Sequence, residues 1–354
     1  MERRIRLVVL AGDGIGPLVI DSALTVLEAL RDLLPWSVQV SRLPFGRAAL
    51  ESEGDMAPSW VLAEASAADA VLLGAVDTIG SGSQTMGTQQ SAVLRLRRHL
   101  GCYANLRPVR PPGGDRAAPP GNGQPGPRID LLFVRELSSG IYYGQPKEIT
   151  GERGSRVAVD TCRYTEQEIV RVATVAFQAA KARRRRLTSV DKANVMCTSQ
   201  LWRQVVSEVA GAYPDVECDH MLVDSFAFRL LTDPARFDVV LTENLFGDIL
   251  TDEAAALVGS LGAMPSASVG VESGPGIYEP VHGSAPDLVG TDSANPIGAI
   301  LSLAMLLGDQ GAMAVKASIE AAVDEVAAVG LLTSDMGGTG TTAMVTKAIT
   351  SRLG

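Results

Sequence analysis

The chain reads Gly-Asp-Ile-Leu-Thr-Asp over residues 247–252, directly after the turn-like Glu-Asn-Leu-Phe of residues 243–246. Two of these residues, Asp248 and Asp252, are four positions apart, so in a helix they share one face about one turn apart. Their carboxylates could then bind one hard cation such as Mg²⁺ or Mn²⁺, which takes oxygen ligands. Aspartate pairs near a helix start are, however, more often surface residues that interact with the helix dipole. The flanking sequence therefore decides what this stretch means.

Three further motifs accompany the aspartate pair. Lys192 lies in Val-Asp-Lys-Ala-Asn (residues 190–194), just past an apolar strand. Residues 10–17 read Leu-Ala-Gly-Asp-Gly-Ile-Gly-Pro, and residues 279–287 read Glu-Pro-Val-His-Gly-Ser-Ala-Pro-Asp. Together these motifs resemble the metal-dependent decarboxylating β-hydroxyacid dehydrogenases, the isocitrate/isopropylmalate dehydrogenase family. The resemblance extends over residues 5 to about 349.

Within that family, three shorter motifs are most similar to the isopropylmalate branch. They are Ala-Asn-Leu-Arg-Pro (residues 104–108), Val-Arg-Glu-Leu (134–137) and Gly-Ile-Tyr-Tyr-Gly (140–144). The resemblance implies NAD- and metal-dependent oxidative decarboxylation of a 3-substituted malate, either 3-isopropylmalate or a close analogue with an apolar substituent.

Composition limits the class of protein. With 354 residues the chain exceeds one usual core, so two lobes are expected. A net charge of -9 argues against nucleic acid, and we interpret the basic run at 181–186 as the end of a helix. No stretch approaches the roughly 18 apolar residues of a membrane span, and residues 5–10 indicate a first strand rather than a signal peptide. Four cysteines without metal-type spacing suit the cytoplasm.

Alternating strand-like and helical stretches predict an α/β fold. The expected strands are 5–10, 37–43, 70–74, 129–134, 187–190 and 237–241, and the expected helices are 17–34, 91–100, 166–183, 198–210, 245–258, 295–307, 312–328 and 340–352. The glycine loop at 12–17 lacks the GxGxxG spacing and has Pro17 at a helix N1 position, so a Rossmann fold is not expected.

The resemblance implies a two-lobed fold with a mixed β-sheet core. Residues 1–106 and 261–354 would form the first, cofactor-side lobe. Residues 107–260 would form the second lobe, with an arm around 140–162 that joins two subunits in a homodimer.

The resemblance also implies a site for NAD at the first lobe. The implied contacts are Ile15, His282, Gly283, Ser284, Ala285, Asp287 and Asn295. Asp287 would accept hydrogen bonds from the adenosine ribose and repel a 2′-phosphate, which favours NAD over NADP. Family members that use NADP tend to carry Lys and Tyr at positions 287 and 288. The alternative for His282 is a turn histidine without a ligand.

For catalysis, the resemblance assigns three arginines to the malate carboxylates, since a guanidinium binds a carboxylate with two hydrogen bonds. These are Arg97, Arg107 and Arg135, whereas Arg95 and Arg98 are expected on a solvated helix face. Asp248 and Asp252 would bind Mg²⁺ or Mn²⁺ together with Asp224 of the other subunit. Lys192 would be the general base, and Tyr142 the acid that protonates the enol carbon.

Two segments depart from the family pattern. Isopropylmalate enzymes carry Glu followed three and four residues later by Leu-Leu, but here residues 90–94 read Gln-Ser-Ala-Val-Leu. The pocket would thus be lined by Ser91, Val93 and Leu94, which suits an apolar 3-substituent. Residues 76–82 replace the usual Gly-Pro-Lys-Trp-like loop and contain Asp77.

Three alternatives remain open on this basis. The chain belongs to leucine biosynthesis, or it is a paralogue in specialised metabolism acting on an aryl-, carboxyalkyl- (homoisocitrate- or isocitrate-like) or phosphonate-bearing malate, or it is a non-catalytic regulatory subunit. Residues 111–128 contain eleven Pro and Gly, which indicates a surface loop or a functional lid.

Overall fold

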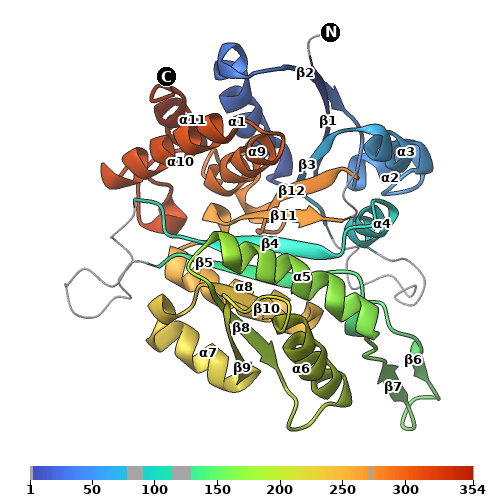
Figure 1. The fold of residues 1–354 in the computed structure, drawn as a ribbon. Helices are drawn as coiled ribbons and strands as arrows, with labels where there is room; N and C mark the ends of the chain where they lie inside the picture. Colours follow the sequence, from blue (N-terminus) through green and yellow to red (C-terminus); the bar gives the residue numbers. More distant parts are fainter. Residues whose placement is uncertain (1–2, 78–90, 114–128, 271–273, 354) are drawn as a thin grey trace.

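The computed structural model describes residues 3–77, 91–113, 129–270 and 274–353. Within these ranges ten strands form one sheet in the order β2-β1-β3-β12-β11-β4-β5-β10-β8-β9 (Figure 1). The strands are β1 (Arg4–Gly12), β2 (Ser37–Arg42), β3 (Ala70–Ala75), β4 (Ala104–Val109), β5 (Leu131–Glu136), β8 (Arg186–Asp191), β9 (Glu217–Leu222), β10 (Val239–Thr242), β11 (Pro265–Val269) and β12 (Gly276–Pro280).

The sheet is mixed. Strand β11 pairs antiparallel with β12 and β4, and β4 pairs antiparallel with β5, whereas the outer strands on both sides pair in parallel. An all-parallel Rossmann sheet is thereby excluded for the described part of the chain, and the predicted α/β class with a mixed sheet is confirmed.

Helices cover both faces of this sheet (Figure 1). One core packs helices α1, α7, α8, α9, α10 and α11 against one face, and two further cores pack α3 with α4 and α5 with α6 against the other. The helices are α1 (Gly16–Ala29), α2 (Arg47–Glu53), α3 (Ser59–Ala67), α4 (Ala92–His99), α5 (Glu166–Ala182), α6 (Cys197–Ala210), α7 (Val223–Thr232), α8 (Asn244–Val258), α9 (Ile297–Asp309), α10 (Met313–Ala328) and α11 (Thr342–Thr350).

Each strand and helix expected from the sequence has a counterpart within a few residues. Helix α5 ends at Ala182, and the basic run beyond it is structural, because Arg183 forms an ion pair of 2.8 Å with the buried Asp238. Strands β4, β9, β11 and β12 and helices α2, α3 and α7 were not predicted. The proposed lobe boundary at residues 106 and 107 passes through β4, and the division into lobes stays a prediction.

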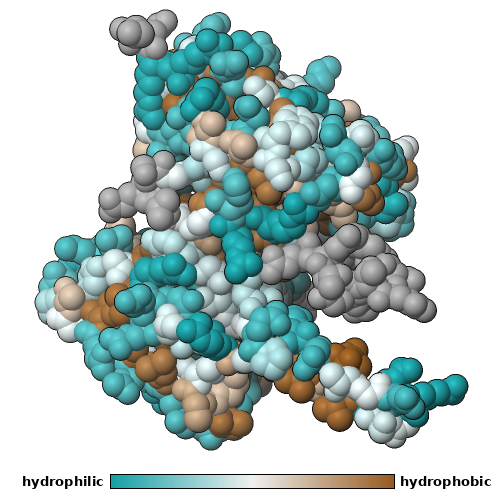
Figure 2. All heavy atoms as spheres, turned by 90° about the vertical axis from the view of Figure 1, so that its right-hand side faces the viewer, coloured by the Kyte–Doolittle hydropathy of each residue, from teal (hydrophilic) through white to brown (hydrophobic). Residues whose placement is uncertain are grey.

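A two-stranded hairpin of β6 (Lys147–Thr150) and β7 (Val157–Asp160) lies apart from the main sheet, within the range expected to form an arm. Figure 2 shows it projecting from the body, with apolar side chains along it. Ile149 is 74% exposed, and Val157 and Val159 are exposed as well. Among the helices described, none is long and apolar enough to cross a membrane. The Pro/Gly-rich residues 114–128 and most of the departing loop, 78–90, lie outside the described residues.

Candidate active site

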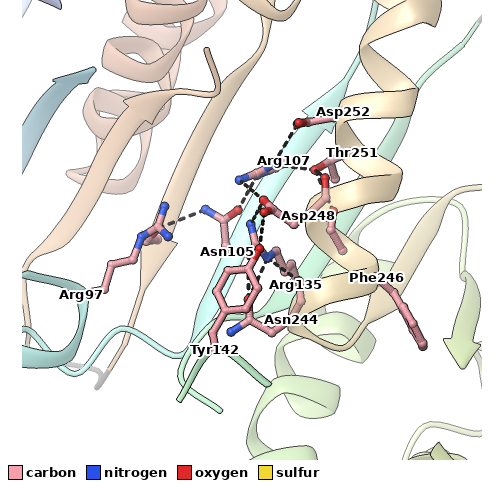
Figure 3. Close-up of polar contacts among 12 residues, drawn as sticks. Arg97, Asn105, Arg107, Arg135, Tyr142, Asn244, Phe246, Asp248, Thr251 and Asp252 are labelled. Carbon is pink, nitrogen blue, oxygen red and sulfur yellow. Dashed lines mark hydrogen bonds and ion pairs between the residues drawn. The ribbon is translucent and has the colours of Figure 1, made fainter. Parts of the chain in front are cut away.

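Helix α8 presents the aspartate pair as the sequence predicted. Glu243 caps its N-terminus, where the side-chain carboxylate accepts a hydrogen bond of 2.6 Å from the backbone N–H of Phe246. Burial raises the pKa of Glu243. Because the helix continues unbroken to Val258, Asp248 and Asp252 lie on one face, and Figure 3 shows both directed toward the same group of polar side chains.

Asp248 is the centre of that group. Its carboxylate accepts hydrogen bonds from Nη1 of Arg135 and from the phenol of Tyr142, and it lies 3.6 Å from Nη2 of Arg107. The guanidinium of Arg135 also lies 5.5 Å from the centre of the Tyr142 ring. Two predicted substrate arginines, the predicted acid and a predicted metal ligand are therefore in direct contact within one chain.

These contacts set the protonation states. Burial alone would raise the pKa of Asp248, but the charge of Arg135, the hydrogen bond from Tyr142 and the charge of Arg107 outweigh it, so the pKa lies below its ordinary value. Burial, together with the bond to Asp248, raises the pKa of Tyr142 to about 12. Burial also raises the pKa of Asp252. At neutral pH the site thus holds a carboxylate beside a phenol that keeps its proton.

Arg107 is buried on β4, next to the pair. Its Nε donates to Asn105 at 2.7 Å and its Nη1 to the hydroxyl of Thr251 at 2.5 Å, while Asp252 lies 3.8 Å away. Burial, with the neighbouring charge of Arg135, lowers the pKa of Arg107 to about 10. A cation in this position favours anionic groups in front of it.

Arg97, at the end of α4, is the third predicted arginine. It is buried and pairs with the buried Glu279 at 2.6 Å, while its Nε has no partner among the described atoms. Its charge also helps to lower the pKa of Asp248. The charges of all three predicted arginines therefore stabilise the same carboxylate. From the sequence, Glu279 was recognised only as part of the motif at residues 279–287. Its ion pair with Arg97 was not predicted.

The remaining predicted residues of the chemistry form a second group. Lys192, just after β8, makes an ion pair with Asp224 in the first turn of α7. Neither residue contacts Asp248 or Asp252 in the hydrogen bonds and ion pairs of the described residues. Within those residues of one chain, no three His, Cys, Asp or Glu side chains are grouped to hold a metal. A complete oxygen cage would need a ligand from elsewhere.

The predicted cofactor side brings the glycine loop against residues 282–287. The N–H of Ile15 donates to the carbonyl of Ser284 at 2.9 Å, and the Ser284 hydroxyl donates to Asp77. Gly14 has φ +59°, and a Cβ there would lie 2.0 Å from the Ser284 carbonyl oxygen, so only glycine allows this approach. A backbone hydrogen bond therefore joins the glycine loop at residues 12–17 to residues 282–287.

His282 offers an open nitrogen on this side. Its Nδ1 lies 2.8 Å from the Gly283 carbonyl, whereas the buried Nε2 has no partner among the described atoms, and burial lowers the pKa of the ring. Asp287 is exposed, and the partly exposed Ala285 lies two residues before it. Asn295 instead uses both ends of its amide, since it donates to Asp335 and accepts from the N–H of Ile297, each at 3.0 Å. The unpartnered nitrogen and the free carboxylate fit a nucleoside ligand.

The predicted pocket residues lie at the start of α4. Ser91 is exposed and Leu94 is partly buried, but Val93 packs against the apolar core beneath α4. Arg95, expected on a solvated face, instead forms two hydrogen bonds with Asp55, at 2.5 and 2.9 Å.

The chain is similar to known proteins in both sequence and fold. The isocitrate/isopropylmalate dehydrogenase family model matches residues 6–353. A 3-isopropylmalate dehydrogenase from Anaeromyxobacter dehalogenans is 45% identical over 98% of this chain and 99% of its own length. Another from Synechococcus is 49% identical over 94% of this chain and 88% of its own. The crystal structure of isocitrate dehydrogenase from Methylococcus capsulatus superposes with a TM-score of 0.89 at 34% identity, and covers 99% of both chains.

Proposed function

The chain belongs to the isocitrate/isopropylmalate dehydrogenase family, and from this we propose that it oxidises and decarboxylates a 3-substituted malate with NAD⁺. The substrate is 3-isopropylmalate or a close analogue with an apolar 3-substituent, and the products are a 2-oxo acid and CO₂. The observation that carries the proposal is the contact of Asp248 with Arg135, Arg107 and Tyr142, in a chain 45% and 49% identical to 3-isopropylmalate dehydrogenases.

The arginines bind the dianionic substrate. Arg107 and Arg135 are buried, so little water competes for their donors, and a malate carboxylate can bind to them with charged hydrogen bonds. Arg97 has a free Nε for the second carboxylate. The cluster selects for a diacid and holds the carboxylate that leaves as CO₂.

Asp248 and Asp252 fit a divalent cation by their chemistry, because they supply hard oxygen donors from one helix face. When bound, Mg²⁺ or Mn²⁺ would stabilise negative charge on the substrate's 2-oxygen. We propose Asp224 of the partner subunit as a further ligand, since Asp224 of the same chain pairs with Lys192 instead.

Two side chains then transfer protons, and a third holds the substrate in place. The partner's Lys192 would accept the proton of the 2-hydroxyl, and NAD⁺, when bound, would supply the acceptor for the hydride on C2. Arg135 holds the carboxylate until the carbon–carbon bond breaks. Tyr142, which keeps its proton because its pKa is about 12, donates it to the enol carbon.

NAD⁺ fits the side formed by Ile15 and residues 282–287. His282 has a buried, unpartnered Nε2 for the nucleoside, and the exposed carboxylate of Asp287 suits a ribose with a free 2′-hydroxyl. A Cβ at Gly283 would meet nothing within 4 Å, so there is open space beside this residue for part of the dinucleotide.

We further propose a homodimer with shared active sites. The hairpin exposes Ile149, and α7 and α8 expose Phe228 (64%) and Ile249 (58%), so apolar surface lies on elements that flank both groups of catalytic residues. A symmetric pairing would bring Lys192 and Asp224 of one subunit to Asp248 of the other. The four free cysteines suit a reducing, cytoplasmic setting.

Two of the competing assignments share the same chemistry and differ only in substrate. Leucine biosynthesis follows from the names of the relatives, whereas Gln90 and Val93 depart from the isopropylmalate pattern and favour a paralogue with another 3-substituent. A regulatory subunit is disfavoured because Lys192, Tyr142 and the three aspartates are all present.

A substrate panel tests the proposal. The purified enzyme is assayed by NADH absorbance with Mg²⁺ or Mn²⁺ on 3-alkyl-, 3-aryl- and 3-carboxyalkylmalates, isocitrate and homoisocitrate. We expect the highest kcat/KM for an apolar 3-substituent, because Val93 and Leu94 are apolar side chains that offer a γ-carboxylate no hydrogen bond. A higher value for isocitrate than for every apolar malate would contradict the pocket, and no turnover of any malate would contradict the function.

A further inference from the structure

Two buried asparagines hold the two arginines that touch Asp248 or Asp252. Asn105 accepts from Nε of Arg107 at 2.7 Å. Asn244 accepts from Arg135 three times, from Nε to its backbone carbonyl at 2.8 Å, and from Nε at 3.2 Å and Nη2 at 2.7 Å to its side-chain oxygen. Both asparagines are 0% exposed. Each arginine therefore donates to the side-chain oxygen of a buried asparagine, although the two asparagines come from different elements.

Each asparagine is itself fixed by a second partner. The Nδ2 of Asn105 donates to the hydroxyl of Ser268 at 3.0 Å, and the Nδ2 of Asn244 donates to the carbonyl of Ser139 at 3.1 Å. Flipping either amide would leave buried donors and acceptors without partners, which is costly. The side-chain oxygen of each asparagine can consequently face only its arginine.

The start of α8 is shaped to admit the Arg135 side chain. A Cβ at Gly247 would lie 2.6 Å from Cγ of Arg135 and 2.3 Å from the hydroxyl oxygen of Thr242. Any larger residue would push the helix off the arginine. Gly247 thus allows Asn244, one turn earlier, to reach the guanidinium.

The contacts leave defined donors free. A guanidinium has one N–H on Nε and two on each Nη. In Arg135, Nε and one Nη2 hydrogen go to Asn244, and one Nη1 hydrogen goes to Asp248. Among the described residues, no hydrogen bond takes the second hydrogen of either Nη, which leaves both for an incoming carboxylate.

We propose that Asn105 and Asn244 are positioning residues, which fix the guanidinium planes of Arg107 and Arg135 before the malate binds. This rests on the proposed function, because it concerns the same site. An arginine fixed in advance loses less conformational freedom when it binds the carboxylate, so the asparagines increase substrate affinity without touching the substrate.

The test compares Asn244→Ala, Asn244→Asp and Asn105→Ala with the wild type on the best malate of the panel. For both alanine variants we expect the malate KM to rise roughly tenfold or more, with the NAD⁺ KM within about twofold of wild type. Asn244→Asp keeps an acceptor for Arg135 and should recover part of the malate KM. Thr341→Ala, which removes a cap from the distant α11, controls for lost stability and should change neither KM.

A double-mutant cycle identifies the route of the effect. In an Arg135→Lys background, Asn244→Ala should add little to the malate KM, because the residue it positions is already changed. Full additivity, or equal rises in both KM values, would overturn the inference. A wild type that turns over no malate would instead reject the proposed function, so the two failures are distinguishable.

Discussion

Ser284 and Asp77 are joined by a hydrogen bond from the serine hydroxyl to the carboxylate, although they are 207 residues apart. Asp77 also accepts from Arg47 at 2.9 Å, and its N–H donates to Asp13 at 2.9 Å. The hydrogen bonds from Ser284 and Arg47 hold the pKa of Asp77 below its ordinary value. Asp77, which departs from the family pattern, thereby ties the end of β3 to the proposed NAD⁺ side.

Asp77→Ala should raise the KM for NAD⁺ several-fold, on the order of 3- to 10-fold, while the malate KM stays unchanged. The reason is that Ser284 loses its partner, whereas the arginine cluster is untouched. Steady-state kinetics with each substrate varied in turn measures this. Asp21→Asn, which breaks the exposed pair with Arg42, is the matched control. An effect on the malate KM alone would contradict the assignment.

Asp248→Asn should be nearly inactive, and the Mg²⁺ concentration for half-maximal residual activity should rise on the order of tenfold, equivalent to about 1.4 kcal/mol of binding. The change removes an anionic ligand and leaves Arg135 without its charged partner. Glu253→Gln removes a carboxylate from the same helix and should leave the metal requirement unchanged. If EDTA does not diminish wild-type turnover, Asp248 and Asp252 do not bind a required metal.

Tyr142→Phe should lower kcat by about 10²- to 10⁴-fold, the usual contribution of a general acid. Because the pKa of Tyr142 is about 12, the phenol does not titrate between pH 7 and 10, so the shape of the kcat profile should be the same in both proteins. A wild-type limb in this range that Tyr142→Phe abolishes would be the contrary result.

The raised pKa of Tyr142 also predicts how the stability of the folded protein depends on pH. The folded value lies above the unfolded value of about 10, so the folded state binds the proton more tightly. The contribution to stability is complete below pH 10 and is lost as pH rises toward 12. Urea unfolding at pH 9 and pH 11 should show a smaller loss of stability in Tyr142→Phe than in wild type.

NAD⁺ should be preferred over NADP⁺ in kcat/KM, and Asp287→Asn should reduce that preference. Asp287 is exposed, so its charge meets the added phosphate through water and the effect should be modest, about 1 kcal/mol or several-fold. Glu320→Gln, a surface carboxylate on α10, serves as the control. A wild-type preference for NADP⁺ would show that Asp287 does not face the ribose.

Mixed dimers test the shared site. Lys192→Met and Asp248→Asn should each be nearly inactive alone, and co-expression should restore about a quarter of wild-type activity. Random pairing makes about half of the dimers mixed, and each mixed dimer has one of two sites intact. Zero recovery, with mixed dimers demonstrated, would place Lys192 at the site of its own chain.

The features that the sequence predicted correctly are those that depend on residues close together in the chain. The aspartate pair follows from helix periodicity, and the glycine loop from its spacing. The pairs Arg97–Glu279 and Arg135–Asn244 join residues 182 and 109 positions apart, so no local pattern could reveal them. Asn105 was accessible in principle, because it is two residues before Arg107 in a strand and hence on the same face.

The strand pair β4–β5 has a consequence for how this gene can change. Asn105 lies directly opposite Arg135 in the antiparallel register, and Arg107 follows on the same face. Deleting one codon within β4 would turn Asn105 and Arg107 toward the apolar core that holds Ala104 and Val134. Substitutions can adjust the site one side chain at a time, whereas a single-residue insertion or deletion in this strand would remove the site and break the core in one event.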